Sequence, residues 1–462
     1  MSRFNNSNPL LILIIALLIL ISVSFIPLNK ISNGFLKDFS FLSDIVPAEE
    51  DSSENVVVAD DNLDPDIAEL LKNEQDNNDS IANNNLTDSI SDDYVYSDTS
   101  IYTEPVIEDY TPNRTGLQHL KMALGHRGSK TVRIAFLGDS YIEGDIFTQN
   151  IREALQDNFG GSGIGYTPVH SEIAGFRRSV NQTSSGWKIK NITESKANMI
   201  LSGVYCNATG LAKTQFKGSK KLRHLESWNT STLLFISPDD VDINVSQNKG
   251  EEQTHHFTGS QEVQALEIDG QTSNISISVN SNNFTALGLY LNDNNGIAVD
   301  NMPIRGYAGI RHHSISAPII EQMRQYIDYD LIVIEYGINA ISSKQLNYNS
   351  YTSALKKDIL KIKSCYPNAD ILILGVGDRG ERRNGEIQTM KAVPAMIKAQ
   401  RRMAQELGIL FWDTQLAMGG NNSIVEWTNN KDTNKDYTHL SFKGGARLGK
   451  LFSDRLIEEI GK

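Results

Sequence analysis

Continuous apolar runs alternate with amphipathic stretches in two parts of the chain. The apolar runs fit strands that are covered on both faces, as in parallel sheets. They occupy residues 132–137, 331–334, 371–376 and 409–412. The stretches with helical spacing occupy residues 117–124, 146–158, 351–366, 391–407 and 442–460. Strands that alternate with helices predict a three-layer α/β/α domain with a parallel sheet.

The pattern changes between residues 172 and 298. Short runs there alternate apolar and polar positions, and Asn, Gly, Ser and Asp separate them. This pattern is typical of an antiparallel β-sandwich. We therefore predict that residues 114–171 and 299–462 form the α/β domain, and that an all-β module at 172–298 interrupts it after the first βα unit.

The N-terminal part carries an uncharged apolar run at residues 10–26. Its length is near the lower limit for a membrane span, which is about 17–25 residues. No Ala-x-Ala cleavage site follows, so an uncleaved signal-anchor is favoured over a cleaved signal peptide. We predict a transmembrane segment within residues 1–30 and export of the C-terminal part to the periplasm or the cell surface.

Acidic residues are concentrated in one segment. Residues 31–113 are rich in Asp, Asn and Ser, which predicts a disordered acidic linker. The chain has a net charge of −13, but residues 49–112 alone carry −18, which leaves +5 for the remainder. The net negative charge argues against nucleic acid as a partner.

The candidate metal ligands and thiols are few. The two cysteines, Cys206 and Cys365, offer neither a disulfide framework nor a Cys/His metal site, and we predict two buried thiols. Adjacent histidines at 255–256 and 312–313 cannot chelate a metal from one strand, because their side chains point to opposite faces. We interpret them as surface histidines and expect no metal and no cofactor.

Three short motifs follow predicted strands or precede the last helix. They are Gly138-Asp139-Ser140, Gly337-Ile338-Asn339 and Asp436-Tyr437-Thr438-His439. A serine after a strand can expose its hydroxyl at the sheet edge where ligands of open α/β folds bind. An asparagine amide can donate to an oxyanion, and an Asp three residues before a His can orient the imidazole. Each motif alone also fits a turn or a helix cap, but together they predict one cleft with a nucleophile, an oxyanion donor and a base.

In this order the motifs resemble the blocks of the SGNH (GDSL-type) hydrolase superfamily. The resemblance implies that Ser140 is the nucleophile, that His439 is the base and that Asp436 orients His439. It also implies an oxyanion hole built from the backbone N–H groups of Ser140 and a second-block glycine, together with the Asn339 amide.

The second block and two neighbouring positions are less regular. The segment VDNMPIRGYAG offers Gly306 as the better candidate for the second-block glycine and Gly309 as the other. Tyr141 follows Ser140 where the superfamily often has Leu, and no Asp follows Asn339. Both positions vary in the superfamily, and neither difference removes a catalytic group.

A longer resemblance narrows the expected activity. The run from Val132 to Val169 resembles the opening of envelope carbohydrate O-acetylesterases, including peptidoglycan O-acetylesterases. In those proteins, too, a β-sandwich resembling a carbohydrate-binding module interrupts the hydrolase. The resemblance implies a metal-free serine esterase that removes acetyl groups from an acylated polysaccharide of the cell envelope or the extracellular space. A glycan O-acyltransferase with the same triad and a non-catalytic glycan-binding protein are the alternatives.

Charged residues near the motifs have simpler interpretations. Asp139, Glu143 and Asp145 crowd the predicted nucleophile, and we interpret them as part of a solvated loop. The arginines within 379–383 lie in a segment that is predicted to be an exposed loop rather than a device that steers an anionic glycan.

Overall fold

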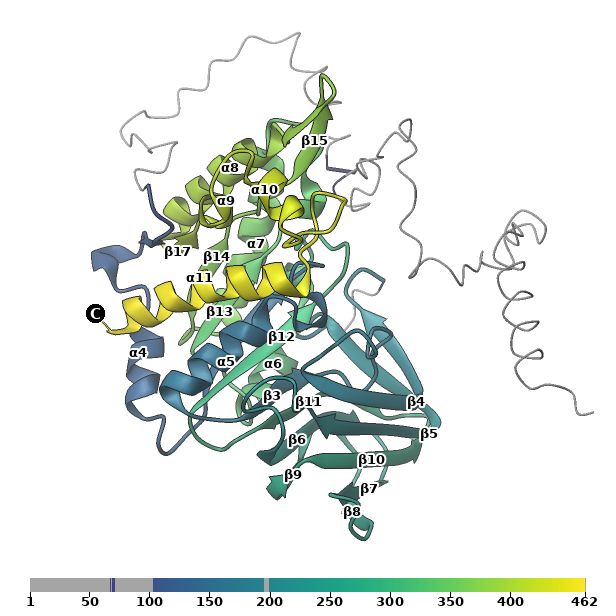
Figure 1. The fold of residues 1–462 in the computed structure, drawn as a ribbon. Coiled ribbons are helices and arrows are strands. Elements are labelled where there is room, and N and C mark those ends of the chain that lie inside the picture. The colour runs from purple at the N-terminus through teal and green to yellow at the C-terminus, as the bar shows by residue number, and fades with distance from the viewer. Residues whose placement is uncertain (1–66, 68, 71–102, 195–198, 462) are drawn as a thin grey trace, which may run out of the picture. The chain divides into compact units, whose positions relative to one another are not determined.

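The computed structural model describes residues 67, 69–70, 103–194 and 199–461, all of which belong to one compact unit (Figure 1). The apolar run at 10–26 and most of the predicted linker lie outside these residues. Within the described residues, no helix has both the length and the apolar character needed to cross a membrane.

A mixed six-stranded sheet forms the first half of the architecture. Its strands run in the order β1-β17-β14-β13-β2-β12; the last five are mutually parallel, and β1 is antiparallel to β17. The bounds are β1 Ile107–Asp109, β17 Leu410–Trp412, β14 Asp370–Leu374, β13 Leu331–Glu335, β2 Val132–Gly138 and β12 Ile297–Pro303.

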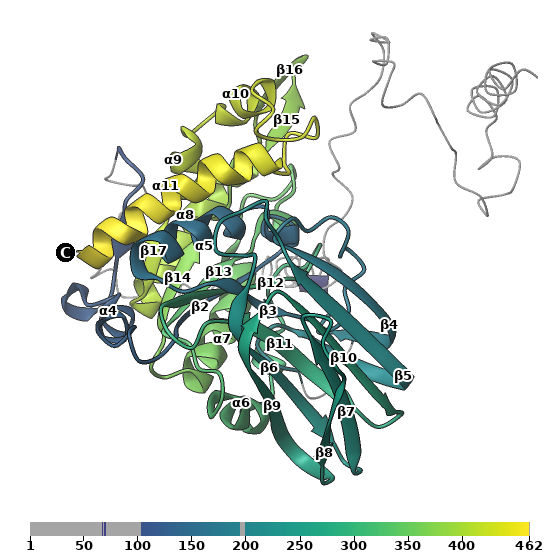
Figure 2. The ribbon, with the colours of Figure 1, turned by 60° about the horizontal axis from the view of Figure 1, so that its bottom comes forward.

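Helices cover both faces of this sheet, as Figures 1 and 2 show. Successive residues of β2 explain why, because Ile134 and Phe136 enter one hydrophobic core while Ala135 and Leu137 enter the other. The first core is completed by α4 Gln118–Gly125, α5 Thr148–Phe159, α9 Thr414–Met418, α10 Ser423–Asn429 and α11 Phe442–Gly461. The second is completed by α6 Ala317–Arg324, α7 Asn349–Cys365 and α8 Ala392–Leu407. The predicted alternation of strands and helices is therefore found.

A nine-stranded antiparallel sheet forms the second half. Its main path is β8-β7-β10-β5-β11-β6-β9, with β3 paired to β11 and β4 paired to β5. The bounds are β3 Gly163–Thr167, β4 Val180–Asn191, β5 Val204–Gly218, β6 Trp228–Ser237, β7 Val241–Gln247, β8 Gln253–Phe257, β9 Ser260–Thr272, β10 Asn274–Ser281 and β11 Thr285–Asn292. The Phe235 ring of β6 lies 4.9 Å from that of Phe284 and 5.0 Å from that of Phe257 on β8, so distant strands share one core.

The two sheets meet along β3 and β12. A Cβ atom at Gly165, whose φ is +75°, would lie 2.3 Å from Asp300 Oδ1 and 2.6 Å from the Val299 carbonyl oxygen, so this close approach requires glycine. Asp300 accepts the backbone N–H of Tyr166 at 2.8 Å and pairs with Arg133 at 3.3 Å. The antiparallel sheet thus begins at β3, ahead of the predicted boundary at residue 172. The prediction missed this strand because its five residues are few and two of them are glycines.

The ordered part also starts earlier than the predicted boundary at residue 114. Strand β1 lies inside the predicted linker 31–113 and pairs with β17. Its Glu108 is buried, with Oε2 3.0 Å from Nε of Arg401 on α8. The acidic composition of this segment predicted disorder. That prediction was wrong for β1, because the arginine that compensates the buried Glu108 lies far away in the sequence.

Short helical turns and one hairpin complete the fold. They are η1 Pro112–Arg114, η2 Glu143–Asp145, η3 His312–Ser314, η4 Ile338–Ala340, and the hairpin β15 Gly380–Arg383 with β16 Glu386–Thr389. The predicted exposed arginine loop is therefore a hairpin, and its first arginine, Arg379, is buried.

Candidate active site

Ser140 lies in the turn that follows β2, and its residue surface is 9% exposed. A Cβ atom at Gly138 would come within 2.9 Å of the Glu335 carbonyl oxygen, so glycine lets β13 approach the end of β2. The neighbouring Tyr141 is buried, and a Cβ atom at Gly377 would lie 2.2 Å from its hydroxyl oxygen. The tyrosine that replaces the usual leucine is therefore accommodated by a glycine on the facing loop.

The loop before α11 holds Asp436 and His439 in a tight turn. Asp436 Oδ1 accepts the backbone N–H groups of Thr438 and His439, each at 3.0 Å, and Tyr437 has a φ of 53°. Asp436 Oδ2 lies 2.8 Å from His439 Nδ1, and His439 Nε2 lies 3.0 Å from Ser140 Oγ. The carboxylate, imidazole and hydroxyl expected from the sequence form one continuous chain of hydrogen bonds.

The electrostatics of these three hydrogen-bonded side chains favour a basic imidazole. The hydrogen bond to Asp436 raises the pKa of His439 above its usual value, although burial acts in the opposite direction. Burial raises the pKa of Asp436, but the hydrogen bonds from His439 outweigh burial and hold that pKa below its usual value. An ionised Asp436 fixes the tautomer in which Nδ1 carries the proton and Nε2 faces Ser140.

Asn339 lies in η4, directly after β13. Gly337 has a φ of 131°, and a Cβ atom there would lie 2.8 Å from Nε2 of Gln400, so the turn requires glycine. The Asn339 Nδ2 donates to Asp139 Oδ2 at 2.7 Å and lies 3.4 Å from the Tyr307 carbonyl oxygen. The second contact is long, so one amide hydrogen is poorly used and can be offered to a bound group.

The two candidate second-block glycines differ in their surroundings. A Cβ atom at Gly309 would lie 2.4 Å from the Tyr336 ring, whereas nothing lies within 4 Å of one at Gly306. Within the described residues, no acceptor is hydrogen-bonded to the backbone N–H of Ser140 or of Gly306. Gly306 therefore borders open space with an available donor, while Gly309 serves the packing of β13.

Two buried carboxyl groups lie against the nucleophile turn. Asp139 accepts the backbone N–H of Tyr141 at 3.0 Å as well as the Asn339 amide, and its own backbone N–H donates to Glu335 Oε2 at 3.3 Å. Burial raises the pKa of Asp139 to about 7. Burial raises the pKa of Glu335 well above its usual value, and the nearby Asp139 charge adds to this shift. Burial thus raises the pKa of both carboxyl groups, and Asp139 is the one that accepts the Asn339 amide.

The interpretation of this region as a solvated loop is wrong, since Asp139, Glu143 and Asp145 are all buried. Asp145 pairs with Nη2 of Arg152 at 3.1 Å and Nη2 of Arg177 at 2.7 Å. Burial raises the pKa of Asp145, but the two guanidinium groups outweigh it and hold the pKa below its usual range. This ion cluster ties the loop after the nucleophile to the beginning of the antiparallel module.

The sequence did offer one signal that we did not use. Glu335 is the only charged residue between Leu331 and Tyr336, and it ends an otherwise apolar strand directly before the Gly337 turn. A carboxyl group at the buried carboxyl end of a parallel strand is expensive unless neighbouring groups compensate it, which marks the position as functional.

The two histidine pairs lie in different surroundings. In the described parts of the chain, no three His, Cys, Asp or Glu residues gather as a metal site would require. His312 is buried rather than at the surface, and burial lowers its pKa to about 4, while His313 Nδ1 pairs with Asp358 at 2.7 Å. Cys206 and Cys365 are buried free thiols, as predicted.

The fold is similar to that of a solved peptidoglycan O-acetylesterase. The two share 21% sequence identity with a TM-score of 0.64, over 77% of this chain and 99% of that chain. A family two carbohydrate esterase from Cellvibrio japonicus is more distant, with 10% identity and a TM-score of 0.26 over 61% of this chain and 99% of that chain. A family described as a protein of unknown function (DUF354) matches residues 224–396, and no curated protein matches.

Proposed function

We propose that this chain is an SGNH-type serine esterase that removes O-acetyl groups from a cell-envelope polysaccharide. The observation that carries the proposal is the unbroken contact from Asp436 through His439 to Ser140, with distances of 2.8 and 3.0 Å. The open N–H groups of Ser140 and Gly306 and the amide of Asn339 add the donors that an oxyanion needs. The similarity in fold to a peptidoglycan O-acetylesterase supports a glycan acetate as the substrate.

In the acylation step, His439 Nε2 removes the proton of Ser140 Oγ as that oxygen attacks the ester carbonyl carbon. The carbonyl oxygen becomes an oxyanion, which the backbone N–H groups of Ser140 and Gly306 and the Asn339 amide stabilise. His439 then donates its proton to the departing sugar oxygen. The products are a deacetylated sugar and an acetyl group on Ser140, and Asp436 stabilises the transient imidazolium.

In the deacylation step, His439 takes a proton from a water molecule that attacks the acetyl carbonyl carbon. The same donors stabilise the second oxyanion, and the proton returns to Ser140 Oγ as acetate leaves. The His439 and Asp436 side chains are about two-fifths exposed, which gives water access to the acyl-enzyme.

The test measures acetate release by the purified full-length chain. The substrates are O-acetylated peptidoglycan, acetylated xylan and 4-nitrophenyl acetate, with Ser140→Ala as the inactive comparison. We expect release from the aryl acetate and from one or both polymers, and no release by the variant. A folded wild-type chain that releases no acetate from any of them contradicts the esterase. Transfer of the acetyl group to an added glycan, without acetate release, identifies the acyltransferase instead.

We also propose that the apolar run at 10–26 anchors the protein in a membrane and that the catalytic part acts outside the cytoplasm. The run is uncharged and long enough to span a bilayer. Carbonate washing of membranes from cells that express the full chain tests the anchor, since a cleaved or peripheral protein appears in the soluble fraction.

A further inference from the structure

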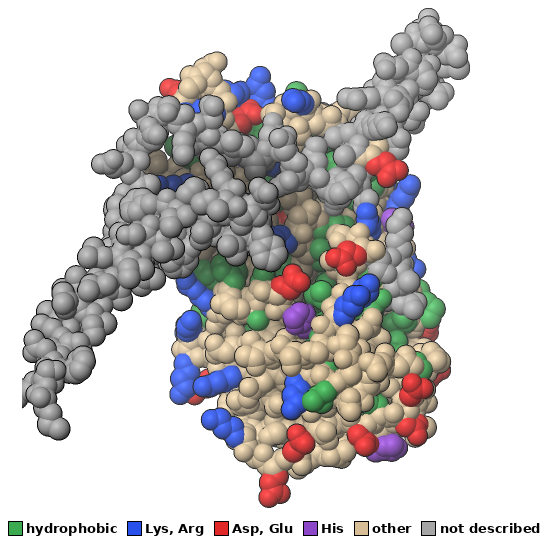
Figure 3. Space-filling model, turned by 90° about the vertical axis from the view of Figure 1, so that its right-hand side faces the viewer, with side chains coloured by type: hydrophobic (Ala, Val, Ile, Leu, Met, Phe, Trp, Pro, Cys, Tyr) green, Lys and Arg blue, Asp and Glu red, His purple; other side chains and the backbone are tan. Residues whose placement is uncertain are grey.

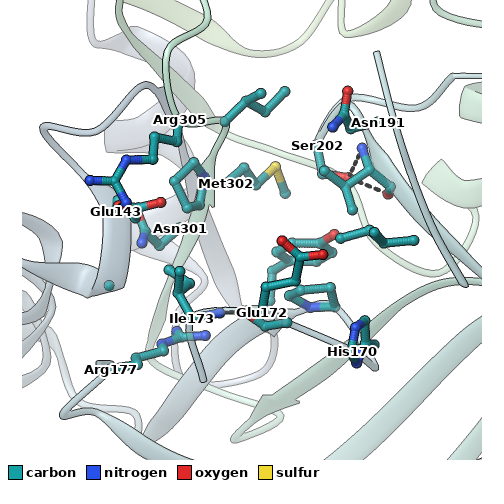
Figure 4. Close-up of a pocket in the computed structure, with 18 of the residues that line it drawn as sticks. Glu143, His170, Glu172, Ile173, Arg177, Asn191, Ser202, Asn301, Met302 and Arg305 are labelled. Carbon is teal, nitrogen blue, oxygen red and sulfur yellow. Dashed lines mark hydrogen bonds and ion pairs between the residues drawn. The ribbon is translucent and has the colours of Figure 1, made fainter. Parts of the chain in front are cut away.

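A cavity of about 220 Å³ lies between the antiparallel module and the carboxyl end of β12 (Figure 4). One wall is Glu143 and Gly144 from the loop after the nucleophile, and another is Asn301 to Arg305 at the end of β12. The remaining wall comes from the module, between Tyr166 and Val204. Neither half of the molecule forms this cavity alone.

The cavity lies next to the reaction centre. Arg305 lines it and directly precedes Gly306, whose N–H is a proposed oxyanion donor. Arg305 pairs with Glu143 across the mouth, with 3.4 Å between Nη1 and Oε2. Both groups are close enough to His439 to interact with its charge. A substrate whose ester carbonyl occupies the oxyanion hole therefore has this cavity directly beside it.

The lining presents hydrogen-bond acceptors to a ligand. Gln182 is almost buried, and its Nε2 donates to the Pro168 carbonyl oxygen at 2.9 Å, which leaves its Oε1 for other partners. The exposed carboxylate of Glu172 is a second acceptor in the lining. A ligand with hydroxyl or amide hydrogens fits these positions.

The charges of the lining disfavour an anionic ligand. Its arginines are paired, because Arg305 contacts Glu143 and Arg177 contacts Asp145. The carboxylate of Glu172 also lines the cavity, as Figure 4 shows, and forms no ion pair with a described residue. Apolar atoms of Ile173, Met302, Ile304 and Val204 fill the space between the polar groups, and such atoms suit the C–H faces of a sugar ring. On the face drawn in Figure 3, Lys and Arg side chains gather toward the left and Asp and Glu side chains toward the lower right, on a surface that is otherwise mostly uncharged.

We propose that this cavity is a subsite for an uncharged pyranose residue that adjoins the acetylated residue in the glycan. The proposal rests on the proposed esterase function and adds that the enzyme acts on an oligomer or polymer rather than on an isolated acetylated sugar. Gln182 and Glu172 accept hydrogen bonds from the hydroxyl or acetamido groups of this residue, and the apolar wall receives its ring. The antiparallel module thus acts as part of the substrate site.

The test compares two substrates in the full-length chain. Ile173→Trp fills the cavity from a partly exposed turn, and Gln182→Met removes an acceptor at nearly constant size. Matched controls are Leu211→Trp, at a side chain that is 58% exposed on β5, and Gln261→Met, at an exposed position of β9. We expect each cavity variant to lower kcat/KM on O-acetylated peptidoglycan about tenfold, mainly through KM, and to change hydrolysis of 4-nitrophenyl acetate less than about twofold. The controls should match the wild type on both substrates.

Equal losses on both substrates, or no loss on either, overturn the subsite. Failure of the esterase itself is distinguished by a binding arm, in which Ser140→Ala is titrated with a trimer of N-acetylglucosamine in a calorimeter. Heat of binding that disappears in the Ser140→Ala/Ile173→Trp double variant supports a sugar subsite even where no acetate is released. Binding that persists unchanged in the double variant places the sugar elsewhere and rejects the proposal.

Discussion

The two sheets of this protein differ in the kind of polar group that they bury. The core of the antiparallel module is made of apolar side chains such as Phe235 and Leu289, and the polar residues buried in its strands, such as Thr214 and Ser231, carry no charge. The carboxyl end of the parallel sheet instead buries Asp139, Glu335 and most of Ser140. Burial of ionisable groups costs stability unless neighbours compensate it. The contrast therefore separates a region built for packing from one built for chemistry.

The module also contains a serine and a histidine in contact, so the two Ser–His pairs can be compared. His170 Nδ1 lies 2.9 Å from Ser184 Oγ, much like the 3.0 Å between His439 Nε2 and Ser140 Oγ. No carboxylate contacts His170, within the residues that the structure describes, and no open backbone donors of a strand end surround Ser184. A Ser–His contact thus occurs in both regions, whereas the carboxylate partner and the candidate oxyanion donors occur only beside Ser140 among the described residues.

The largest expected effect comes from substituting the serine of each Ser–His pair. Ser140→Ala removes the nucleophile, and we expect kcat/KM for 4-nitrophenyl acetate to fall at least about 10⁴-fold, with the melting temperature nearly unchanged. The matched variant Ser184→Ala removes the serine of the other Ser–His pair and should retain full activity. Activity that survives in Ser140→Ala but is lost in Ser184→Ala would move the reaction to the module.

Asn339→Ala should produce the next largest loss. Removal of one oxyanion donor costs about a hundredfold to a thousandfold in kcat. The loss should appear in kcat rather than in KM, because the oxyanion forms only in the transition state. Asn283→Ala, at an exposed asparagine of the module, is the control. A loss confined to KM would show that Asn339 binds the ground state instead.

Glu335 tests the role of the buried acid pair. Burial favours the neutral form of Glu335, and Glu335→Gln is neutral, nearly the same size and keeps an oxygen that can accept the Asp139 N–H, so kcat should stay within about threefold of the wild type. Glu335→Leu removes that oxygen and should lower kcat about tenfold, because Asp139 then holds Asn339 less well. Steady-state kinetics on 4-nitrophenyl acetate separates the two, and equal activity in both variants would make Glu335 a packing residue only.

The pH profile should respond more modestly. The base acts when His439 is neutral, and its pKa is raised by the hydrogen bond to Asp436, so the acidic limb of kcat/KM should have its midpoint above the usual histidine value of about 6.5. Asp436→Asn removes the negative charge, which should lower both the activity and the midpoint. A midpoint that rises in Asp436→Asn contradicts this assignment of the partner.

The smallest expected effect on catalysis comes from the core of the module. Phe235→Ala leaves a cavity beside Phe284 and Phe257 and should reduce the free energy of unfolding by about 3–5 kcal/mol. The rate of 4-nitrophenyl acetate hydrolysis per folded molecule should stay the same. Denaturant unfolding and active-site titration on one sample check both halves of this statement, and Leu211→Ala is the exposed control.

The same contrast explains what could be predicted from the sequence. The buried strands were evident because a strand covered on both faces is a continuous apolar run, as in β2 and β13. Ser140 and Asn339 were noticed because each follows such a strand, and Asp436 and His439 because they lie three residues apart just before the last helix.

Long-range compensation was not evident. The burial of Asp145 depends on Arg177, and that of Glu108 on Arg401, which local sequence does not reveal. The burial of His312 also involves a residue that is distant in the sequence. Its backbone N–H donates to the buried carboxylate of Asp358 on α7. Residue types that look solvated in isolation are buried here because their partners arrive from other elements.

The insertion of the module between β2 and β12 has a consequence for how the chain acquires its nucleophile. Strand β12 pairs in parallel with β2, from Ile297 beside Val132 to Pro303 beside Gly138, and every strand of the antiparallel sheet lies between them in the sequence. During synthesis the N-terminal parts emerge first, so the module can complete its core before β2 has any parallel neighbour. Closing that long loop gives the nucleophile strand a high contact order. A nascent chain that has not reached Ile297 carries Ser140 without the sheet that positions it, so the proposed hydrolytic activity would be acquired only late in folding.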